Sequence, residues 1–259
     1  MAKKNFWIKF LVITNVITIC CFGYIAIHDK VPQRFLNKLG IIKFETQVKR
    51  YVNYRIEALH SLGSDKEGFE IIMLGDSITE GGNWEQLLKG YNVANYGIGG
   101  DTTTGILYRL SDVYMAHPQK VFLMIGTNDI GLHHSRIYDD NNNVKTVFEN
   151  YKKIIDALHG KEIEVIVQST LNVTEKRTER PNNEINTLNQ LLQEYCLKEN
   201  IKYLDINSVL SNNGVLQGQY TSDGLHLNKK GYDCWRTLIV NNPHQRWGLE
   251  RRPLKEALL

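Results

Sequence analysis

The stretch "IIMLGDSITEGGNW", residues 71–84, changes character at its fifth position. Four apolar residues are followed at once by Gly75-Asp76-Ser77, and two more glycines come soon after. A buried strand that ends in an ordinary turn would show this pattern, because Gly, Asp and Ser are common turn formers. A nucleophilic serine at the carboxyl end of a strand would show it as well. The stretch alone leaves both interpretations open.

The rest of the chain alternates between short apolar runs and helical patterns. The apolar runs cover residues 69–74, 92–95, 121–125, 163–167 and 201–206. The helical patterns cover residues 84–89, 103–116, 144–159, 184–199 and 229–240. Such an alternation predicts βαβ units, with a parallel sheet buried under helices on both faces. We therefore expect an α/β fold, a three-layer α/β/α sandwich with a five-stranded parallel sheet.

The composition is that of an ordinary globular protein. Of 259 residues, 42% are hydrophobic and 23% are charged. The roughly 200 residues that follow the N-terminal segment are enough for one domain with a full core. The net charge of +3 is small, so it gives no support to a nucleic-acid partner.

The N-terminus carries a candidate membrane anchor. Residues 10–27, "FLVITNVITICCFGYIAI", contain no formal charge and would span about 27 Å as a helix, close to the thickness of the bilayer core. No cleavage site of small residues follows, and Ile19 stands before Cys20 where a lipoprotein would have a small residue. We therefore expect one uncleaved transmembrane helix. Positive charges flank this segment almost equally, so they do not determine its orientation. Because the N-terminal tail is very short, we expect it to stay in the cytoplasm and the domain to lie outside.

Three regions follow from these patterns. We expect a membrane anchor in residues 1–30, a helical connector in residues 31–62 and a single globular domain in residues 63–259. Cys196 and Cys234 are the only cysteines of the globular part and lie on separate predicted helices. The sequence leaves open whether they pair.

Polar segments follow the predicted strands where a parallel sheet binds its ligands, beyond the carboxyl ends. Gly75-Asp76-Ser77 follows the first strand, "NYGIGGDTTTG" (95–105) the second and "GTNDIG" (126–131) the third. A fourth segment, "TSDGLHLNKKGY" (221–232), precedes the last helix.

A nucleophilic Ser77 would need a base, because a free serine hydroxyl is barely ionised at neutral pH. Of the eight histidines, His226 has a carboxylate three residues earlier, at Asp223, with a glycine between them. The segment 223–226 can fold as one turn in which Asp223 reaches Nδ1 and Nε2 faces a serine. The chain order Ser, Asp, His is one of the known triad orders. The alternative is a histidine of a surface loop.

Acyl chemistry also needs hydrogen-bond donors for the developing oxyanion. Gly100 can direct a backbone N–H at a ligand, and the side chain of Asn128 can offer a second donor. The rival interpretation of residues 97–105 as a phosphate-binding loop fails, because the G-K-[ST] ending is missing and Asp101 would repel an anion. The dinucleotide fingerprint is not met either, since Thr102 stands at its third glycine.

Together these blocks resemble the SGNH hydrolase superfamily, the GDSL-type esterases and lipases. GDSI (75–78), GIGGDT (97–102), GTND (126–129) and DGLH (223–226) match its four blocks in order, over about residues 69–240. Ile78 replaces the usual leucine, which is a conservative change. The second block is most similar to the branch that includes platelet-activating-factor acetylhydrolase subunits and carbohydrate acetylesterases.

The resemblance implies a flavodoxin-like fold and a serine esterase without metal or cofactor. It implies that Ser77 is the nucleophile, that His226 is the base and that Asp223 orients the imidazole. The N–H groups of Ser77 and Gly100 and the side chain of Asn128 would form the oxyanion hole. The expected reaction is hydrolysis of short acyl esters such as O-acetyl groups, on carbohydrate or cell-envelope substrates, through an acyl-enzyme.

Three alternatives stay open. The same acyl-enzyme could transfer its acyl group to a cell-envelope polysaccharide. The chain could instead be a lysophospholipase or thioesterase, or a binding module without catalysis. Specificity would come from loops such as 131–143 and 171–183, whose composition says only that they are polar.

Overall fold

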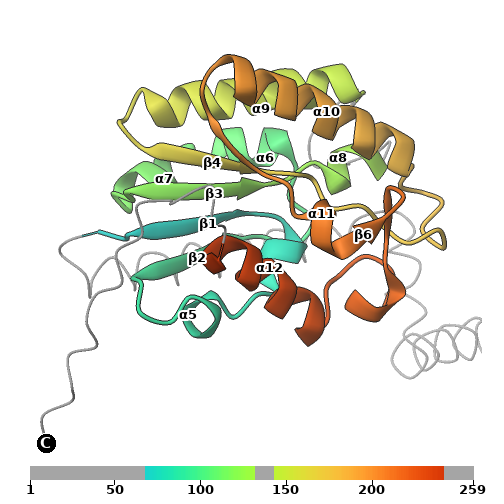
Figure 1. Cartoon of the computed structure of the whole chain (residues 1–259). Coiled ribbons are helices and arrows are strands. Elements are labelled where there is room, and N and C mark those ends of the chain that lie inside the picture. Colours follow the sequence, from blue (N-terminus) through green and yellow to red (C-terminus); the bar gives the residue numbers. More distant parts are fainter. Residues whose placement is uncertain (1–67, 132–142, 242–259) are drawn as a thin grey trace, which may run out of the picture. The chain divides into compact units, whose positions relative to one another are not determined.

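The computed structural model describes residues 68–131 and 143–241 (Figure 1). The sheet in this part has five parallel strands in the order β2-β1-β3-β4-β5. The strands are β1 (Ile71–Gly75), β2 (Val93–Gly97), β3 (Lys120–Met124), β4 (Glu164–Gln168) and β5 (Lys202–Leu204). The predicted α/β fold with a five-stranded parallel sheet is confirmed.

Helices cover both faces of the sheet. In Figure 1, α9 and α10 lie above the strands, and α5 and α12 lie below them. The first layer comprises α6 (Thr103–Tyr108), α7 (Leu110–Met115), α9 (Val144–His159) and α10 (Asn182–Lys198). The second comprises α4 (Ser77–Glu80), α5 (Trp84–Leu87), α11 (Asn207–Leu210) and α12 (Lys229–Asn241).

Alternate residues of each strand enter two separate cores. Ile72 and Leu74 of β1 pack under α9 and α10, whereas Ile71 and Met73 pack against the layer of α12, and all four are fully buried. A strand buried on both faces has no polar face, which is why β1 reads as a continuous apolar run.

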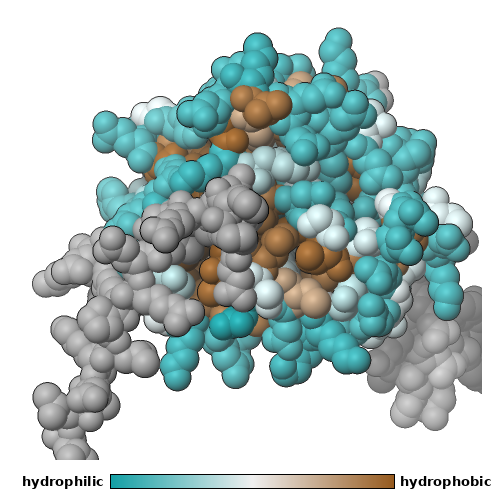
Figure 2. Space-filling model, in the orientation of Figure 1, coloured by the Kyte–Doolittle hydropathy of each residue, from teal (hydrophilic) through white to brown (hydrophobic). Residues whose placement is uncertain are grey.

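Figure 2 shows the outer surface as largely hydrophilic on this side, with apolar side chains gathered near its centre.

The sequence patterns missed several short elements. These are the helices α4, α8 (Thr127–Gly131) and α11, the antiparallel pair β6 (Ser211–Asn212) and β7 (Val215–Leu216), and the 3₁₀ turn Gly218–Tyr220. They are too short to show a helix or strand period. Asn213 and Gly214 join β6 to β7 with positive φ values of 49° and 74°. An Asn-Gly pair is a strong hairpin signal, so this turn could have been predicted.

The helix predicted over residues 103–116 is interrupted. It divides into α6 and α7 at Arg109, whose backbone leaves the helical region. The Arg109 side chain is buried and bonds back toward the sheet. The break therefore falls at the residue whose side chain bonds the strand ends.

The predicted anchor and connector, residues 1–62, lie outside the described residues, as does most of the loop 131–143. Within residues 68–131 and 143–241, no helix is both long enough and apolar enough to cross a bilayer. Cys196 and Cys234 are free thiols, the first buried and the second half-buried.

The strand order creates a switch point beside β1. From β1 the chain crosses to β2 on one side, and β3 then lies on the other side of β1. In open α/β sheets the crevice beyond the carboxyl ends at such a point is where ligands bind. Ser77 follows β1 and Asn128 follows β3, so both belong to this crevice.

Candidate active site

Ser77 is the first residue of α4, directly beyond β1, and its side chain is half-buried. Asp76 caps the helix, because its Oδ1 accepts the Ile78 N–H at 2.9 Å. A Cβ at Gly75 would lie 2.2 Å from Thr79 Oγ1 and 2.3 Å from the Met124 carbonyl oxygen. Only glycine therefore lets α4 start this close to β1 and β3, which places Ser77 at the sheet edge.

Two aromatic side chains hold α4 in place. The Tyr232 hydroxyl donates to the Ile78 carbonyl at 2.7 Å, and Trp84 Nε1 donates to the Thr79 carbonyl at 2.8 Å. Trp84 also packs edge-on against Trp235, with ring centroids 4.8 Å apart. These residues fix the turn that carries Ser77. Sequence reasoning missed them, because buried aromatics look alike whether or not they support a site.

The structure brings Ser77, His226 and Asp223 into one hydrogen-bonded chain. His226 Nε2 lies 2.9 Å from Ser77 Oγ, and His226 Nδ1 lies 2.7 Å from Asp223 Oδ2. A carboxylate at Nδ1 favours the tautomer with its proton there, which leaves the Nε2 lone pair toward Ser77. The arrangement can therefore remove the hydroxyl proton of Ser77.

Backbone hydrogen bonds shape the turn that carries His226. Asp223 Oδ1 accepts the N–H groups of Leu225 at 2.9 Å and of His226 at 2.8 Å. The Thr221 hydroxyl donates to the His226 carbonyl at 2.7 Å and accepts the Gly224 N–H at 2.9 Å. The aspartate therefore orients both the imidazole ring and the backbone of its own turn.

Asp223 is ionised at neutral pH. Its partial burial would raise the pKa, but hydrogen bonds from the His226 ring and from two backbone N–H groups outweigh this and hold the pKa well below its usual range. Arg177 adds a further contact, since its Nε donates to the Asp223 carbonyl at 2.9 Å and its Nη2 lies 3.5 Å from Oδ2. Arg177 belongs to the loop 171–183 and was missed, because nothing local links it to Asp223.

The candidate oxyanion donors are tied to one another. Gly100 adopts φ +79°, which a side chain would strain. Asn128 is buried; its Nδ2 donates to the Asp101 carbonyl at 2.9 Å and lies 3.5 Å from Asp76 Oδ2. Asn128 is thus fixed between the Gly100 loop and the Ser77 turn. Among the described residues, no acceptor occupies the N–H of Ser77 or of Gly100.

A buried ion pair joins the Gly100 loop to the strand ends. Arg109 Nε donates to Asp101 Oδ2 at 2.8 Å, and its Nη2 donates to the carbonyls of Gly75 (3.1 Å) and Tyr96 (3.0 Å). Sequence reasoning treated Asp101 only as a residue that repels anions. No feature of the sequence distinguishes Arg109 from a surface arginine of an amphipathic helix.

Each of the first three blocks contributes one buried aspartate: Asp76, Asp101 and Asp129. Asp129 Oδ1 accepts the Thr103 hydroxyl at 2.6 Å and its N–H at 3.0 Å. Burial raises the pKa of Asp76 and of Asp129 to about 7, and it raises the pKa of Asp101 as well. These acids support the loops around Ser77. In the described segments no three His, Cys, Asp or Glu side chains are placed to hold a metal ion.

Curated relatives cover the same part of the chain. Over 162 residues it is 33% identical to N-acylneuraminate cytidylyltransferase of Streptococcus agalactiae, a match that covers 62% of this chain and only 36% of that protein. Over 181 residues it is 27% identical to platelet-activating factor acetylhydrolase IB subunit alpha2 of Rattus norvegicus, a match covering 65% of this chain and 72% of that one.

A solved structure and a family model identify the family of the chain. The lipase/acylhydrolase from Enterococcus faecalis is 28% identical, with a TM-score of 0.59 over 71% of this chain and 98% of that one. The model of the GDSL-like lipase/acylhydrolase family matches residues 73–234, which contain all four blocks and the triad-like chain of hydrogen bonds. The predicted family is thereby confirmed: the chain belongs to the GDSL-like lipase/acylhydrolase family.

Proposed function

We propose that the chain hydrolyses short acyl esters, O-acetyl groups in particular, on carbohydrate or cell-envelope substrates. The observation that carries this proposal is the continuous hydrogen-bonded chain from Ser77 through His226 to Asp223, at the switch point beside Asn128. In this proposal Ser77 is the nucleophile, His226 is the general base and Asp223 orients the imidazole.

Acylation is the first half of the proposed reaction. Ser77 Oγ attacks the ester carbonyl carbon as His226 Nε2 takes the hydroxyl proton, and the Asp223 carboxylate stabilises the resulting imidazolium. The N–H groups of Ser77 and Gly100 and the Nδ2 of Asn128 bind the oxyanion. The tetrahedral intermediate then collapses: the bond to the alcohol oxygen breaks, and the alcohol leaves with the proton from His226.

Deacylation reverses the roles. A water molecule gives its proton to His226 Nε2 and attacks the acyl carbon, and the carboxylic acid departs as Ser77 recovers its proton. A sugar hydroxyl in place of water would transfer the acyl group instead. The same acyl-enzyme therefore serves hydrolysis and transfer, and product analysis distinguishes them.

The substrate class rests on the two curated relatives. One relative is named as an acetylhydrolase, which supports a short acyl group. The name of the other contains N-acylneuraminate, a sugar acid, which supports a carbohydrate substrate. Because this chain spans little more than a third of that second protein, the carbohydrate class is our proposal.

We also propose that residues 10–27 anchor the enzyme in a membrane, with the domain outside the cytoplasm. The support is the length and apolar character of that segment. A protease added to intact cells would then remove the domain. Protection of the domain until the cells are lysed would contradict this location.

The direct test is an acyl-chain series on the full chain. We expect p-nitrophenyl acetate to be cleaved faster than the butyrate and octanoate esters, with Ser77→Ala inactive. Ser111→Ala, an exposed serine on α7, is the matched control and should retain activity. Mass spectrometry of reactions with added sugars separates hydrolysis from transfer. A preference for octanoate would favour the lipid alternative, and full activity of Ser77→Ala would refute the proposed nucleophile.

A further inference from the structure

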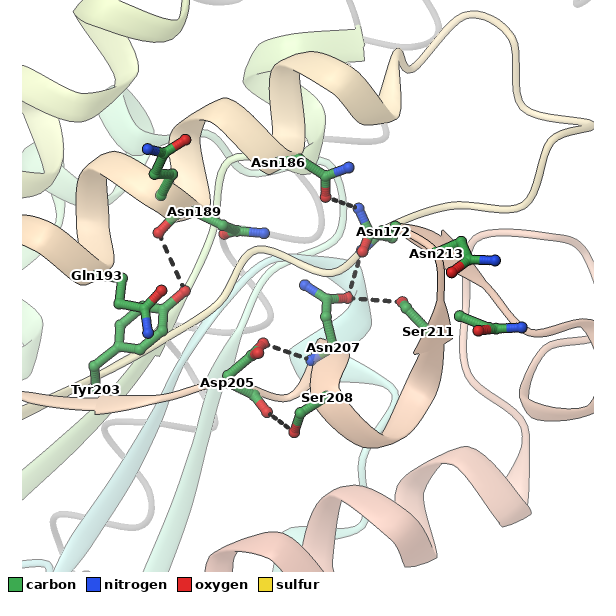
Figure 3. Close-up of a pocket in the computed structure, with 13 residues that line it drawn as sticks. Asn172, Asn186, Asn189, Gln193, Tyr203, Asp205, Asn207, Ser208, Ser211 and Asn213 are labelled. Carbon is green, nitrogen blue, oxygen red and sulfur yellow. Dashed lines mark hydrogen bonds between the residues drawn. The ribbon is translucent and has the colours of Figure 1, made fainter.

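A cavity separate from Ser77 lies at the same edge of the sheet and is not used by the proposed mechanism. Its volume is about 370 Å³, and eight of its thirteen lining residues are asparagine or glutamine. Figure 3 shows it between α10 on one side and the segment after β5 on the other. Gln193 and Asn186 of α10 face Tyr203, Asp205 and the start of α11 across it (Figure 3).

The lining suits a neutral ligand rich in hydroxyl groups. Among the described residues, no lysine or arginine lines the cavity, so these walls offer nothing to pair with a phosphate or carboxylate. The same walls contain one carboxylate, Asp205, and one aromatic ring, Tyr203, so they offer little surface to an acyl chain. Each amide side chain presents a donor and an acceptor side by side, which is the pattern that sugar hydroxyls can bind.

Some of the asparagine side chains that line the cavity are held by hydrogen bonds within the protein. Asn172 Nδ2 donates to Asn186 Oδ1 at 2.7 Å, and Asn207 Nδ2 donates to the Thr170 carbonyl at 2.8 Å. Within the described part of the chain, the Nδ2 of Asn186 and the side-chain amide of Gln193 have no hydrogen-bond partner in the protein. Both side chains are exposed, so a ligand can bind them by displacing water without breaking a bond within the protein, while the other amides keep the wall rigid.

The cavity and Ser77 share the carboxyl edge of the sheet. Three strand spacings separate β1 from β5, which is about 14 Å. The Asn182 side chain bonds both the N–H and the carbonyl of Val173, at 2.9 and 2.7 Å. The next residue, Thr174, donates its N–H to the Gly224 carbonyl in the turn of His226, at 3.0 Å. Asn172, which lines the cavity, directly precedes these residues, so the segment 172–174 both forms part of the cavity wall and supports the catalytic turn.

We propose that this cavity is a distal subsite, which binds a neutral saccharide unit of the same glycan whose ester is cleaved at Ser77. The proposal rests on the proposed function, because it names part of the substrate of that site. It requires the enzyme to prefer esters on oligosaccharides over esters on small alcohols. The contribution of the subsite is to affinity for the long substrate, not to the chemistry at Ser77.

The first test is direct binding to the full chain carrying Ser77→Ala. Calorimetry with xylotetraose and with the tetramer of N-acetylglucosamine measures the dissociation constant without turnover. We expect at least one of these neutral probes to bind. The double variant Asn186→Ala with Gln193→Ala should weaken its binding about five- to 150-fold, as the loss of two hydrogen bonds to neutral groups predicts. The matched control is Asn183→Ala, an exposed asparagine of α10 that does not line the cavity.

The second test is kinetic and uses an otherwise unchanged chain. In the double variant we expect KM for an acetylated tetrasaccharide to rise by the same factor, with unchanged kcat/KM for p-nitrophenyl acetate. The double variant also loses the Asn172–Asn186 bond, which could impair folding. The Gln193→Ala single variant avoids this, because the Gln193 amide bonds no described residue. It should show part of the KM rise.

The outcomes separate this inference from the proposed function. Binding of neither tetrasaccharide, or equal binding by the cavity variants and by Asn183→Ala, would overturn the subsite even if p-nitrophenyl acetate is cleaved. A parent chain that cleaves no ester would overturn the proposed function, whatever the binding experiment shows.

Discussion

Replacing Arg109 by methionine should strongly destabilise the domain. The Arg109 and Asp101 side chains are 1% and 6% exposed, and they form a hydrogen-bonded ion pair at 2.8 Å. Methionine keeps much of the volume but removes the charged partner of the Asp101 carboxylate. Among the described residues, the carboxylate then keeps only its hydrogen bond from the Thr102 N–H, at 3.0 Å. It also removes the donor to the Gly75 and Tyr96 carbonyls.

The expected loss is about 3–5 kcal/mol, the usual cost of removing one partner from a buried ion pair. A domain of this size is stable by about 5–15 kcal/mol in total, so the variant should be near its folding limit. Burial already raises the pKa of Asp101, and without Arg109 the carboxyl is more readily protonated. The loss should therefore shrink as the pH falls below neutral, because protonation of Asp101 removes the unpaired charge.

Urea unfolding of the full chain measures this, with the fluorescence of the buried Trp84 and Trp235 as the signal. The double variant Arg109→Met with Asp101→Asn removes both charges, so it should be more stable than Arg109→Met alone. Arg236→Met, at a half-buried arginine of α12, is the control for loss of an arginine. A loss below about 1 kcal/mol, or a double variant less stable than Arg109→Met, would refute the reasoning.

Three further outcomes follow from the same contacts. Asn128→Ala should lower kcat about 10²–10³-fold; an unchanged kcat would mean that its side chain does not bind the oxyanion. Asp223→Asn should lower kcat by about four orders of magnitude, because the amide favours the wrong imidazole tautomer; wild-type rates would leave Ser77 and His226 as a dyad. The pKa values of Asp76 and Asp129 are raised to about 7 in the folded chain, against about 4 when unfolded, so the folded chain retains protons that the unfolded chain releases. The free energy of unfolding should therefore fall as the pH rises from about 4 to about 7, and fall less in Asp129→Asn; identical slopes for the two proteins in urea titrations would contradict this.

The sequence was informative where a pattern is local. Strands buried on both faces read as apolar runs, so all five strands were located to within a few residues. The turn of residues 223–226 is also local, and its hydrogen bonds join residues two or three positions apart. The contact between His226 and Ser77 is not local, since it joins residues 149 positions apart. It was expected because Ser77 follows a predicted strand and because the four blocks resemble those of a known family.

The supporting contacts were not predictable because they join distant parts of the chain. Arg109 reaches Gly75 across 34 positions, Arg177 reaches Asp223 across 46, and Tyr232 reaches Ile78 across 154. The sequence around each of these residues looks like that of an ordinary helix or loop, so it does not mark them as supports of the site. The amide-lined cavity was hidden in the same way, since its residues are spread between positions 172 and 214.

The proposed reaction depends most directly on an acyl group carried by Ser77. The measurement is mass spectrometry of the full chain, quenched with acid during turnover of p-nitrophenyl acetate and digested, with Asp223→Asn used to slow deacylation. We predict that the peptide containing Ser77 gains the mass of one acetyl group, that fragmentation places it on Ser77, and that Ser77→Ala shows no such gain. An acetyl group on another residue that turns over at the catalytic rate, or ester cleavage that persists in Ser77→Ala, would contradict the proposed mechanism.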